Sequence, residues 1–261
     1  MSFQVARQAG ALGAYITGID LDAGVDDATF EKLGDAFLEH HVICFRGQTL
    51  SPAQHLEFSA RWGDIFVHPY VESIEGHSGI MEVGDPHPIT VTWHSDSTHA
   101  KAPPRMSLLF ARELPAFGGD TMFASQHAAF DALSPALANL LEGLRAVHKG
   151  TELAAQGGLT RQEVSSTHPV VRRHPVNGRK ALYVNADYTK HFEGMTEEES
   201  APLLAYLYAH ACRPAFTWRH HWELGDLLIW DNASVQHAVV PDVASGERLL
   251  HRVTVEGDVP V

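Results

Sequence analysis

Two histidines and an aspartate are the residues best suited to chemistry in a chain that holds 18 histidines among 261 residues. His94 and Asp96 stand two apart in the run WHSD, and on a strand such residues point to the same face. The best third ligand is His237, which follows an apolar run and a polar turn in LLIWDNASVQH. Two imidazoles and one carboxylate on one side of an ion leave up to three positions open. That arrangement is typical of a non-heme Fe(II) oxygenase.

The triad alone leaves other interpretations open. A His-x-Asp doublet arises by chance in a chain rich in both residue types, and His99 could form a different local cluster. A metal-dependent hydrolase or lyase with the same ligands is one rival, although zinc prefers closed coordination with more nitrogen or sulfur ligands. A catalytically inactive binding module is the other, and it is disfavoured because all three ligand candidates are present.

Two arginines near the C-terminus favour a metal site over a chance His-x-Asp doublet. Arg248 and Arg252 have the same parity in RLLHR, so both side chains of the predicted strand would face the same way. One guanidinium could bind the far carboxylate of a dicarboxylic acid and the other a second anion nearer the metal, because guanidinium suits planar, bidentate capture. Two solvated arginines are the alternative. Leu250, Val253 and Val255 place apolar residues on both faces and favour at least partial burial.

The elements that must position these residues are short strands and a few helices. Capping signals and apolar spacing predict helices over 26–41, from 51 onward, over 134–144 and over 196–212. Strands are predicted at 14–21, 42–45, 79–83, 91–94, 105–112, 120–124, 168–173, 181–185, 214–219, 226–230, 235–240 and 248–255. Residues 150–166 have weak periodicity and are predicted to form a surface segment or lid.

This element pattern favours a β-sandwich or jelly roll wrapped by helices. Strands do not alternate regularly with helices, so a doubly wound parallel sheet is less favoured. The sequence contains no Gly-rich dinucleotide turn, phosphate-binding loop or nucleophile elbow. The length fits one large domain, or at most two.

Charge and composition exclude several classes of partner. The formal net charge is −13 and no basic block is present, so neither nucleic acid nor an anionic membrane is an expected partner. No apolar run reaches the roughly 18 residues of a membrane span, and the N-terminus lacks an apolar signal core. A cytoplasmic location is therefore expected. Cys44 and Cys212 lie in apolar runs and are expected to be small core residues without a disulfide.

Longer stretches extend the pattern over nearly the whole chain. They include ALGAYITGIDL, HHVICFRGQTLSPAQHLEFSARWGD, WHSDSTHAKAPPRMSLLFARELPAFGGDTMFAS, HPVVRRHPVNGRKALYVN, GDLLIWDNASVQHAVVPD and RLLHRVTVEGD. With these runs the chain resembles the taurine dioxygenase-like family of Fe(II)- and 2-oxoglutarate-dependent dioxygenases, which also includes alkylsulfatases and aryloxyalkanoate dioxygenases. The resemblance implies one domain over 1–261, mainly β with helices: a double-stranded β-helix (jelly roll) core flanked by α-helices.

The resemblance also implies roles for five residues around the metal and the cosubstrate. His94, Asp96 and His237 would bind Fe(II) and form the catalytic centre. Thr121, in the GGDT turn, and Arg248 would hold the distal carboxylate of 2-oxoglutarate. O2 would be the second cosubstrate.

Substrate roles follow from the same resemblance. Arg252 would lie near the keto-acid end of the cosubstrate and the substrate anion. His68 occupies the place where relatives bind a sulfonate, and the backbone N–H of Ser97 could assist. His99 stands where the taurine enzyme has an aromatic pocket residue, and Thr90 where it has an asparagine that contacts the substrate amine. These two departures put taurine itself in doubt as the substrate.

The implied reaction is hydroxylation of a small anionic substrate, coupled to decarboxylation of 2-oxoglutarate to succinate and CO2. The substrate would be a sulfonate, an alkyl sulfate or an aryloxyalkanoate. An amino-acid-like or carboxylate substrate, hydroxylated at a simple C–H bond, is the alternative within the family. By analogy with relatives, a homo-oligomer, either dimer or tetramer, is expected.

Overall fold

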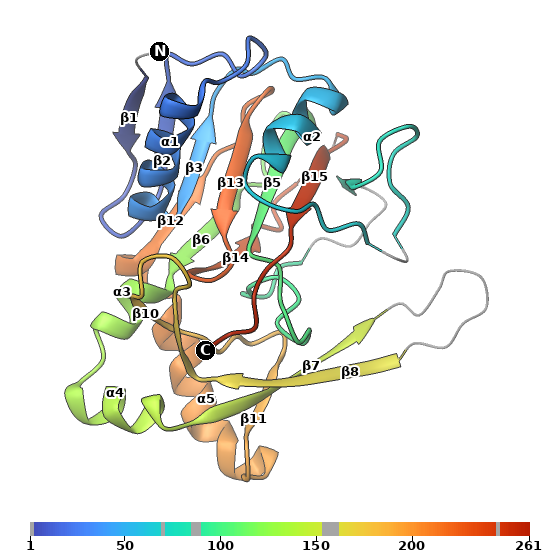
Figure 1. Cartoon of the computed structure of the whole chain (residues 1–261). Coiled ribbons are helices and arrows are strands. Elements are labelled where there is room, and N and C mark those ends of the chain that lie inside the picture. The colour runs from blue at the N-terminus through green and yellow to red at the C-terminus, as the bar shows by residue number, and fades with distance from the viewer. Residues whose placement is uncertain (1–2, 69–70, 85–89, 153–161, 244–245) are drawn as a thin grey trace.

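Two β-sheets face each other in the computed structural model, which describes residues 3–68, 71–84, 90–152, 162–243 and 246–261 (Figure 1). Among these residues the larger sheet has the strand order β1 (Gln4–Arg7), β2 (Ala14–Thr17), β3 (Val42–Phe45), β13 (Leu227–Asp231), β5 (Met106–Glu113), β15 (Leu249–Val255), β4 (Ile80–Gly84). The smaller sheet has the order β12 (Thr217–His220), β6 (Thr121–Ser125), β14 (Val235–Val239). Neighbouring strands are antiparallel except β2 and β3, which are parallel. The predicted jelly roll is confirmed.

Apolar and aromatic side chains fill the space between the two sheets. Phe123 on β6 lies 6.1 Å from Trp218 on β12 and 5.7 Å from Trp230 on β13, measured between ring centroids. Leu228, Leu250 and other buried residues of β3, β5, β13 and β15 complete this cluster. Inward-facing side chains of two packed sheets form a shared core in this way, and that core fixes one sheet against the other.

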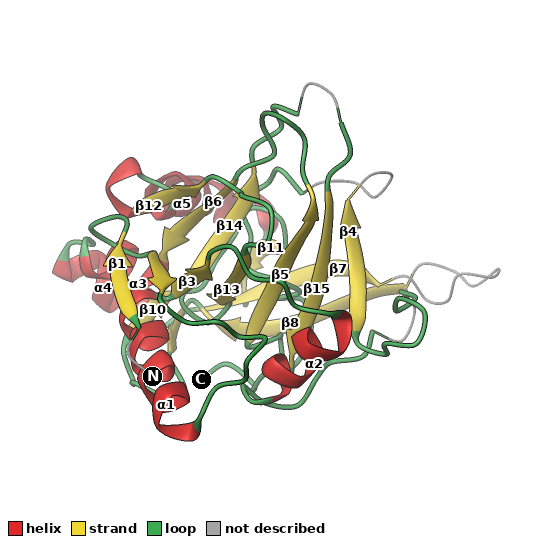
Figure 2. Ribbon diagram, turned by 90° about the horizontal axis from the view of Figure 1, so that it is seen from above, coloured by secondary structure: helices red, strands yellow, loops and turns green. Residues whose placement is uncertain are grey.

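Two helices cover the outer face of the larger sheet (Figure 2). They are α1 (Asp27–His40) and α2 (Pro52–Ala60). The Asp26 side chain accepts a hydrogen bond from Thr29 N at the start of α1, and Ser51 forms a capping box with Gln54 at the start of α2. These caps satisfy backbone N–H groups that a helix start leaves unpaired, so both predicted starts are confirmed.

A second layer of structure packs beside the smaller sheet. Its helices are α3 (Gln126–Asp131), α4 (Pro135–Glu142) and α5 (Glu197–Ala211). They share a buried cluster with a three-stranded sheet, β11 (Thr189–Phe192), β7 (Arg145–Glu152), β8 (Gln162–Pro169), and with the pair β10 (Lys180–Leu182), β9 (Val171–Arg173). Ser134 and Thr196 cap α4 and α5 as predicted. Helix α3 was not predicted. A short 3-10 helix, Pro214–Phe216, leads into β12.

Two strand predictions need correction. The described parts of the segment 150–166 belong to β7 and β8; residues 153–161 lie outside the described chain, so the surface segment or lid stays a prediction. Residues 91–94 form no strand, because only His94 finds a partner, in a single bridge with His237. Residues 214–219 begin with the 3-10 turn, and the strand starts at Thr217. Long-range backbone pairing decided these cases over local preference.

Candidate active site

The three metal-ligand candidates meet at one point between the sheets. His94 N donates to His237 O at 3.1 Å, and His237 N donates to His94 O at 2.7 Å. This bridge brings the two histidines together from distant parts of the chain. Asp96 Oδ1 lies 3.7 Å from His94 Nε2 and 3.6 Å from His237 Nε2. All three side chains are buried and their ligand atoms share one small volume, as a mononuclear metal site requires.

Neighbouring groups orient these ligands. His94 Nδ1 lies 2.8 Å from Thr92 O, so Nδ1 carries the proton and Nε2 is left for a metal. Ser107 Oγ donates to Asp96 Oδ2 at 3.0 Å. The Asn232 side chain accepts from Asp96 N at 3.3 Å. Metal-binding side chains in proteins are commonly held by such outer hydrogen bonds.

Charge and burial act on all three ligand candidates; burial disfavours a charged His94, but its hydrogen bond and charge interaction with Asp96 raise the His94 pKa. Burial disfavours a charged Asp96, but Arg252, His237 and His94 outweigh it and hold the Asp96 pKa well below its usual range. Burial also lowers the pKa of His237 to about 3, with a further contribution from His94. A deprotonated carboxylate and a neutral imidazole are the forms that bind a metal. The donor set of this site therefore fits a divalent first-row metal ion.

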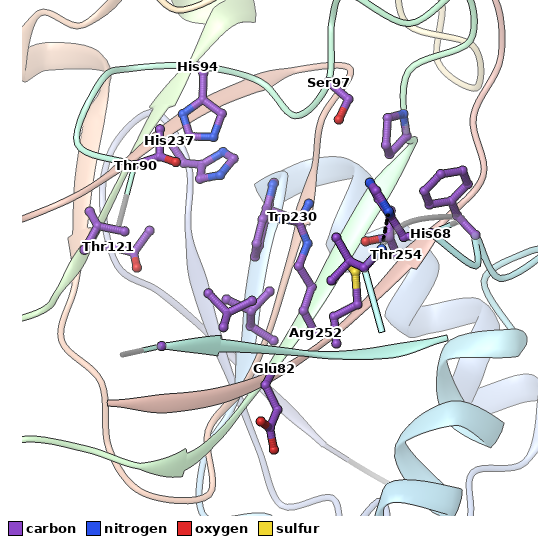
Figure 3. A pocket seen from close by; sticks show the side chains of 18 of the residues that line it. His68, Glu82, Thr90, His94, Ser97, Thr121, Trp230, His237, Arg252 and Thr254 are labelled. Atoms are coloured by element: carbon purple, nitrogen blue, oxygen red, sulfur yellow. Dashed lines mark hydrogen bonds between the residues drawn. The ribbon is translucent and has the colours of Figure 1, made fainter. Parts of the chain in front are cut away.

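A cavity of about 360 Å³ opens beside the ligands (Figure 3). His94 and His237 lie next to each other at one side of it, and Arg252 extends from β15 into the view beside Trp230. Eight of the ten predicted site residues line this cavity: His68, Thr90, His94, Ser97, Thr121, His237, Arg248 and Arg252. Predicted site residues from distant segments of the chain thus line one cavity.

Arg248 is a buried cation in this cavity wall. It is 5% exposed, and its Nε donates to Gly119 O at 3.2 Å. No ion pair joins it to a carboxylate in the described part of the chain. Burial lowers the pKa of the Arg248 guanidinium to about 10. Thr121 lines the same wall, and its hydroxyl accepts from Trp222 Nε1 at 3.0 Å. A buried charge without an ion-pair partner is costly, so this wall suits an anionic ligand.

The predicted alternation of the C-terminal strand is confirmed. Arg248, just before β15, and Arg252 and Thr254 within it line the cavity, whereas Val255 packs in the outer cluster under α1 and α2. Arg252 Nη2 lies 2.6 Å from Asp96 Oδ2. One arginine therefore touches the metal-ligand candidate Asp96, and the other lines the far wall of the same cavity.

A second cavity, of about 450 Å³, shares part of its lining with the first. Phe66, His68 and Ser97 line both cavities. His99 lines only the second, beside Tyr188, and the two rings lie 5.0 Å apart between centroids. The predicted pocket wall at His99 therefore belongs to the second cavity, called the outer cavity below because the metal-ligand candidates His94 and His237 line the first, or inner, cavity. Thr90 lies in the inner cavity.

Several residues at the site escaped the sequence analysis. Trp230 packs 4.8 Å from His237 and donates from Nε1 to Asn232 Oδ1 at 2.9 Å. Tyr188 lies 6.3 Å from His94, and burial raises its pKa above the ordinary value for tyrosine. Ser107 bonds to Asp96 as described above. The run WDN, which begins at Trp230, could have indicated that Trp230 lies at the site, whereas no local motif indicates Tyr188 or Ser107.

A second group of metal-ligand types lies elsewhere in the core. Cys44, His220 and Asp226 have ligand atoms within 4.8 Å of one another and are fully buried. Asp226 Oδ2 already accepts from Arg46 at 2.7 Å and from Glu223 N at 2.9 Å. None of these three residues lines the cavity beside His94 and His237. Burial raises the pKa of Cys44 well above the usual range, in keeping with its predicted role as a core residue.

Known proteins resemble this chain in sequence and in structure. Residues 4–254 match the family "Taurine catabolism dioxygenase TauD, TfdA family". An alpha-ketoglutarate-dependent sulfate ester dioxygenase of Pseudomonas putida is 36% identical over 277 residues, covering 100% of this chain and 92% of the relative. An alkylsulfatase of Acinetobacter baylyi is 33% identical over 98% of this chain and 86% of its own length. A crystal structure of a taurine dioxygenase from Burkholderia xenovorans has TM-score 0.90 and 35% identity, covering 100% of this chain and 91% of that one.

Fold, cavity and relatives together define the class: the molecule is an alpha-ketoglutarate-dependent dioxygenase that acts on a small molecule. Within that class, the chain belongs to the TauD, TfdA family. The relatives favour this activity over the two rival hypotheses, the metal hydrolase and the inactive module. No helix among the described residues has the length and apolar character needed to cross a bilayer. The single-domain boundary, the expected oligomer and the cytoplasmic location stay predictions.

Proposed function

We propose that the chain binds Fe(II) through His94, Asp96 and His237 and hydroxylates a small organic anion. The donor set supports this metal, because two imidazoles and one carboxylate with room beside them suit non-heme Fe(II). With 2-oxoglutarate and O2, the bound iron supplies hydroxylation coupled to decarboxylation to succinate and CO2. The protein's share is to bind, orient and shield the reactants.

One observation carries the proposal furthest: Arg248 is buried without a described carboxylate partner on the cavity that contains the metal ligands. A dicarboxylic cosubstrate supplies what is missing, since one carboxylate can pair with Arg248 and the other end can reach the metal. Thr121 stands beside it as a second hydrogen-bonding group. Guanidinium binds a carboxylate through two parallel hydrogen bonds, which would also fix the direction of the cosubstrate.

Arg252, His68 and the Ser97 N–H form the proposed substrate-anion site. Arg252 stands at the metal ligand Asp96, while His68 and Ser97 line both cavities. The Nδ1 atom of His68 accepts from Val71 N at 3.0 Å, which orients its ring. An anion held here would place its neighbouring carbon near the metal and its remainder toward the outer cavity. Walls of apolar side chains around both cavities would exclude water from the reacting centre.

A sulfate ester or sulfonate is the proposed substrate class, with aryloxyalkanoates as close competitors. The similarity to the sulfate ester dioxygenase and the alkylsulfatase supports the choice. The amino-acid-like alternative needs a carboxylate to receive an amine. Glu82 is the acidic residue at the inner cavity, yet its side chain points away from the labelled site residues (Figure 3). The cavity therefore favours a simple anion with an apolar remainder.

A substrate panel tests the proposal. Alkyl sulfates, sulfonates, aryloxyalkanoates and N-acylated amino acids are incubated with Fe(II), 2-oxoglutarate and O2, and succinate release is measured. We expect the highest succinate yield, matched by sulfate release, from an alkyl sulfate with an apolar chain. If no member of the panel raised succinate release above the uncoupled background, that result would contradict the proposed function.

A further inference from the structure

Ser97 has an unusual backbone conformation at the centre of the proposed anion site. Its φ is 47°, in the left-handed region, and His41 is the other non-glycine residue of the described chain with positive φ. Ser97 directly follows Asp96 and lines both cavities. A side-chain-bearing residue keeps such a conformation only where its surroundings hold it, and this occurs often at functional sites. The residues that hold Ser97 therefore bear on substrate binding.

Thr98 is the anchor next to Ser97. Its side chain is fully buried, and its Oγ1 lies 2.9 Å from His148 Nδ1. Asn185 Nδ2 donates to the same oxygen at 3.1 Å. Burial lowers the pKa of His148 to about 3, so the ring is neutral and the contact is an ordinary hydrogen bond. One hydroxyl thus ties the chain after Asp96 to β7, where His148 lies, and to the loop before β11.

Strand β7 also contacts His99, the residue after Thr98. A Cβ atom on Gly150 would come within 2.4 Å of the His99 ring, so only glycine permits the observed contact. Lys149 N, between these two β7 positions, donates to Tyr188 O at 2.8 Å, and the Tyr188 ring lies beside His99. The β7 backbone and the Tyr188 ring therefore enclose His99, while His148 holds Thr98.

We propose that Thr98 is a positioning residue for the substrate anion. Held by His148 and Asn185, it keeps Ser97 in the left-handed conformation and so keeps the Ser97 N–H, which lies beside the Tyr188 hydroxyl, at the cavity wall that the anion would reach. The inference rests on the proposed function, because it deepens the account of the same anion site. Arg248 directly precedes β15 and Thr121 begins β6, and Thr98 contacts neither strand through any described hydrogen bond. Loss of the Thr98 hydroxyl should therefore weaken binding of the substrate anion and leave binding of the cosubstrate unchanged.

The test uses inorganic sulfate as the probe, so that it does not depend on turnover. The protein is loaded with Zn(II) in place of iron and with 2-oxoglutarate, and the Ser97 amide resonance is followed during a sulfate titration. Thr98→Val removes the hydroxyl at nearly constant shape, and Thr98→Ser restores it. We expect at least tenfold weaker sulfate binding in Thr98→Val and recovery to within about threefold in Thr98→Ser. The 2-oxoglutarate affinity should stay within about threefold in both.

Kinetics with the best panel substrate give a second readout. Thr98→Val should raise the substrate KM about tenfold and leave kcat and the 2-oxoglutarate KM within about threefold. Should Thr98→Val fail to fold, Gly150→Ala tests the same support, because its methyl group displaces His99 and should also raise the substrate KM.

Three results would overturn the inference. They are sulfate titrations that leave the wild-type Ser97 amide unmoved, wild-type sulfate affinity in folded Thr98→Val or Gly150→Ala protein, and an equal loss of sulfate and cosubstrate affinity. An inactive wild type that still binds sulfate at Ser97 would count against the proposed function alone.

Discussion

Arg252 donates to Asp96 at 2.6 Å, so the arginine of the proposed anion site touches the proposed metal ligand directly. The same guanidinium donates to Ser107 Oγ at 3.0 Å, and Ser107 donates to Asp96. Metal ligand, serine and arginine thus form one connected group, in which substrate anion and metal share a neighbour. Loss of Arg252 would affect both, and the two effects can be separated experimentally.

Replacement of Arg252 should act chiefly on the substrate. We expect Arg252→Ala to raise the substrate KM by roughly 10- to 100-fold, the range for a lost charge-assisted hydrogen bond. The 2-oxoglutarate KM should change far less, because Arg248 stays in place. Steady-state kinetics with the best anionic substrate measure both values. Full activity of Arg252→Ala on that substrate would show that the anion site lies elsewhere.

Replacement of Arg248 should act on the cosubstrate. Arg248→Ala removes the buried cation of the far wall, and we expect the 2-oxoglutarate KM to rise by roughly 10- to 100-fold. Arg179→Ala is a matched control, because Arg179 is an exposed arginine paired with Asp131 away from the cavity lining. Unchanged 2-oxoglutarate KM in Arg248→Ala would refute the assignment. Substrate KM measured at saturating 2-oxoglutarate should stay near the wild-type value.

Buried histidines should make the fold less stable in acid. His55 on α2 is fully buried, and burial lowers its pKa to about 3. The unfolded chain binds a proton at this residue below about pH 6.5 while the folded chain does not, so the free energy of unfolding falls as pH drops from about 6.5 toward 3. His55 alone should contribute a loss of about 1.4 kcal/mol between pH 7.5 and 5.5.

Urea unfolding at those two pH values checks this expectation. His55→Phe should reduce the acid loss by about 1.4 kcal/mol, since it removes the protonation of the unfolded chain. His77→Gln, at a partly exposed position, serves as the control and should retain most of the wild-type loss. An acid loss in His55→Phe equal to the wild-type value would mean that His55 is protonated alike in both states.

Local signals predicted much of this molecule. The caps at Asp26, Ser51, Ser134 and Thr196 mark true helix starts, because capping depends on a few neighbouring residues. Arg248, just before β15, and Arg252 within it line the same cavity, as their common parity predicted. The grouping of His94, Asp96 and His237 was predicted as well, although residues 91–94 form no strand and His94 meets His237 through a single bridge.

Features that depend on distant partners were missed. Strands β7 and β8 have weak apolar alternation and arise through their mutual backbone pairing, so no strand was predicted within 150–166. Ser97 has a left-handed backbone conformation although it is not a glycine, so its residue type does not indicate that conformation. Tyr188 reaches the site because the loop before β11 packs against β7, and no short motif encodes that contact. Tertiary context decided these positions.

The central claim is that His94, Asp96 and His237 bind Fe(II) beside 2-oxoglutarate. Its most direct test is the visible metal-to-ligand charge-transfer band that forms when Fe(II) and 2-oxoglutarate are added without oxygen. We predict a band in the wild type at one Fe(II) per chain, and its loss in His94→Ala and in Asp96→Ala. Absence of the band from folded wild-type protein, or an undiminished band in His94→Ala, would contradict the account.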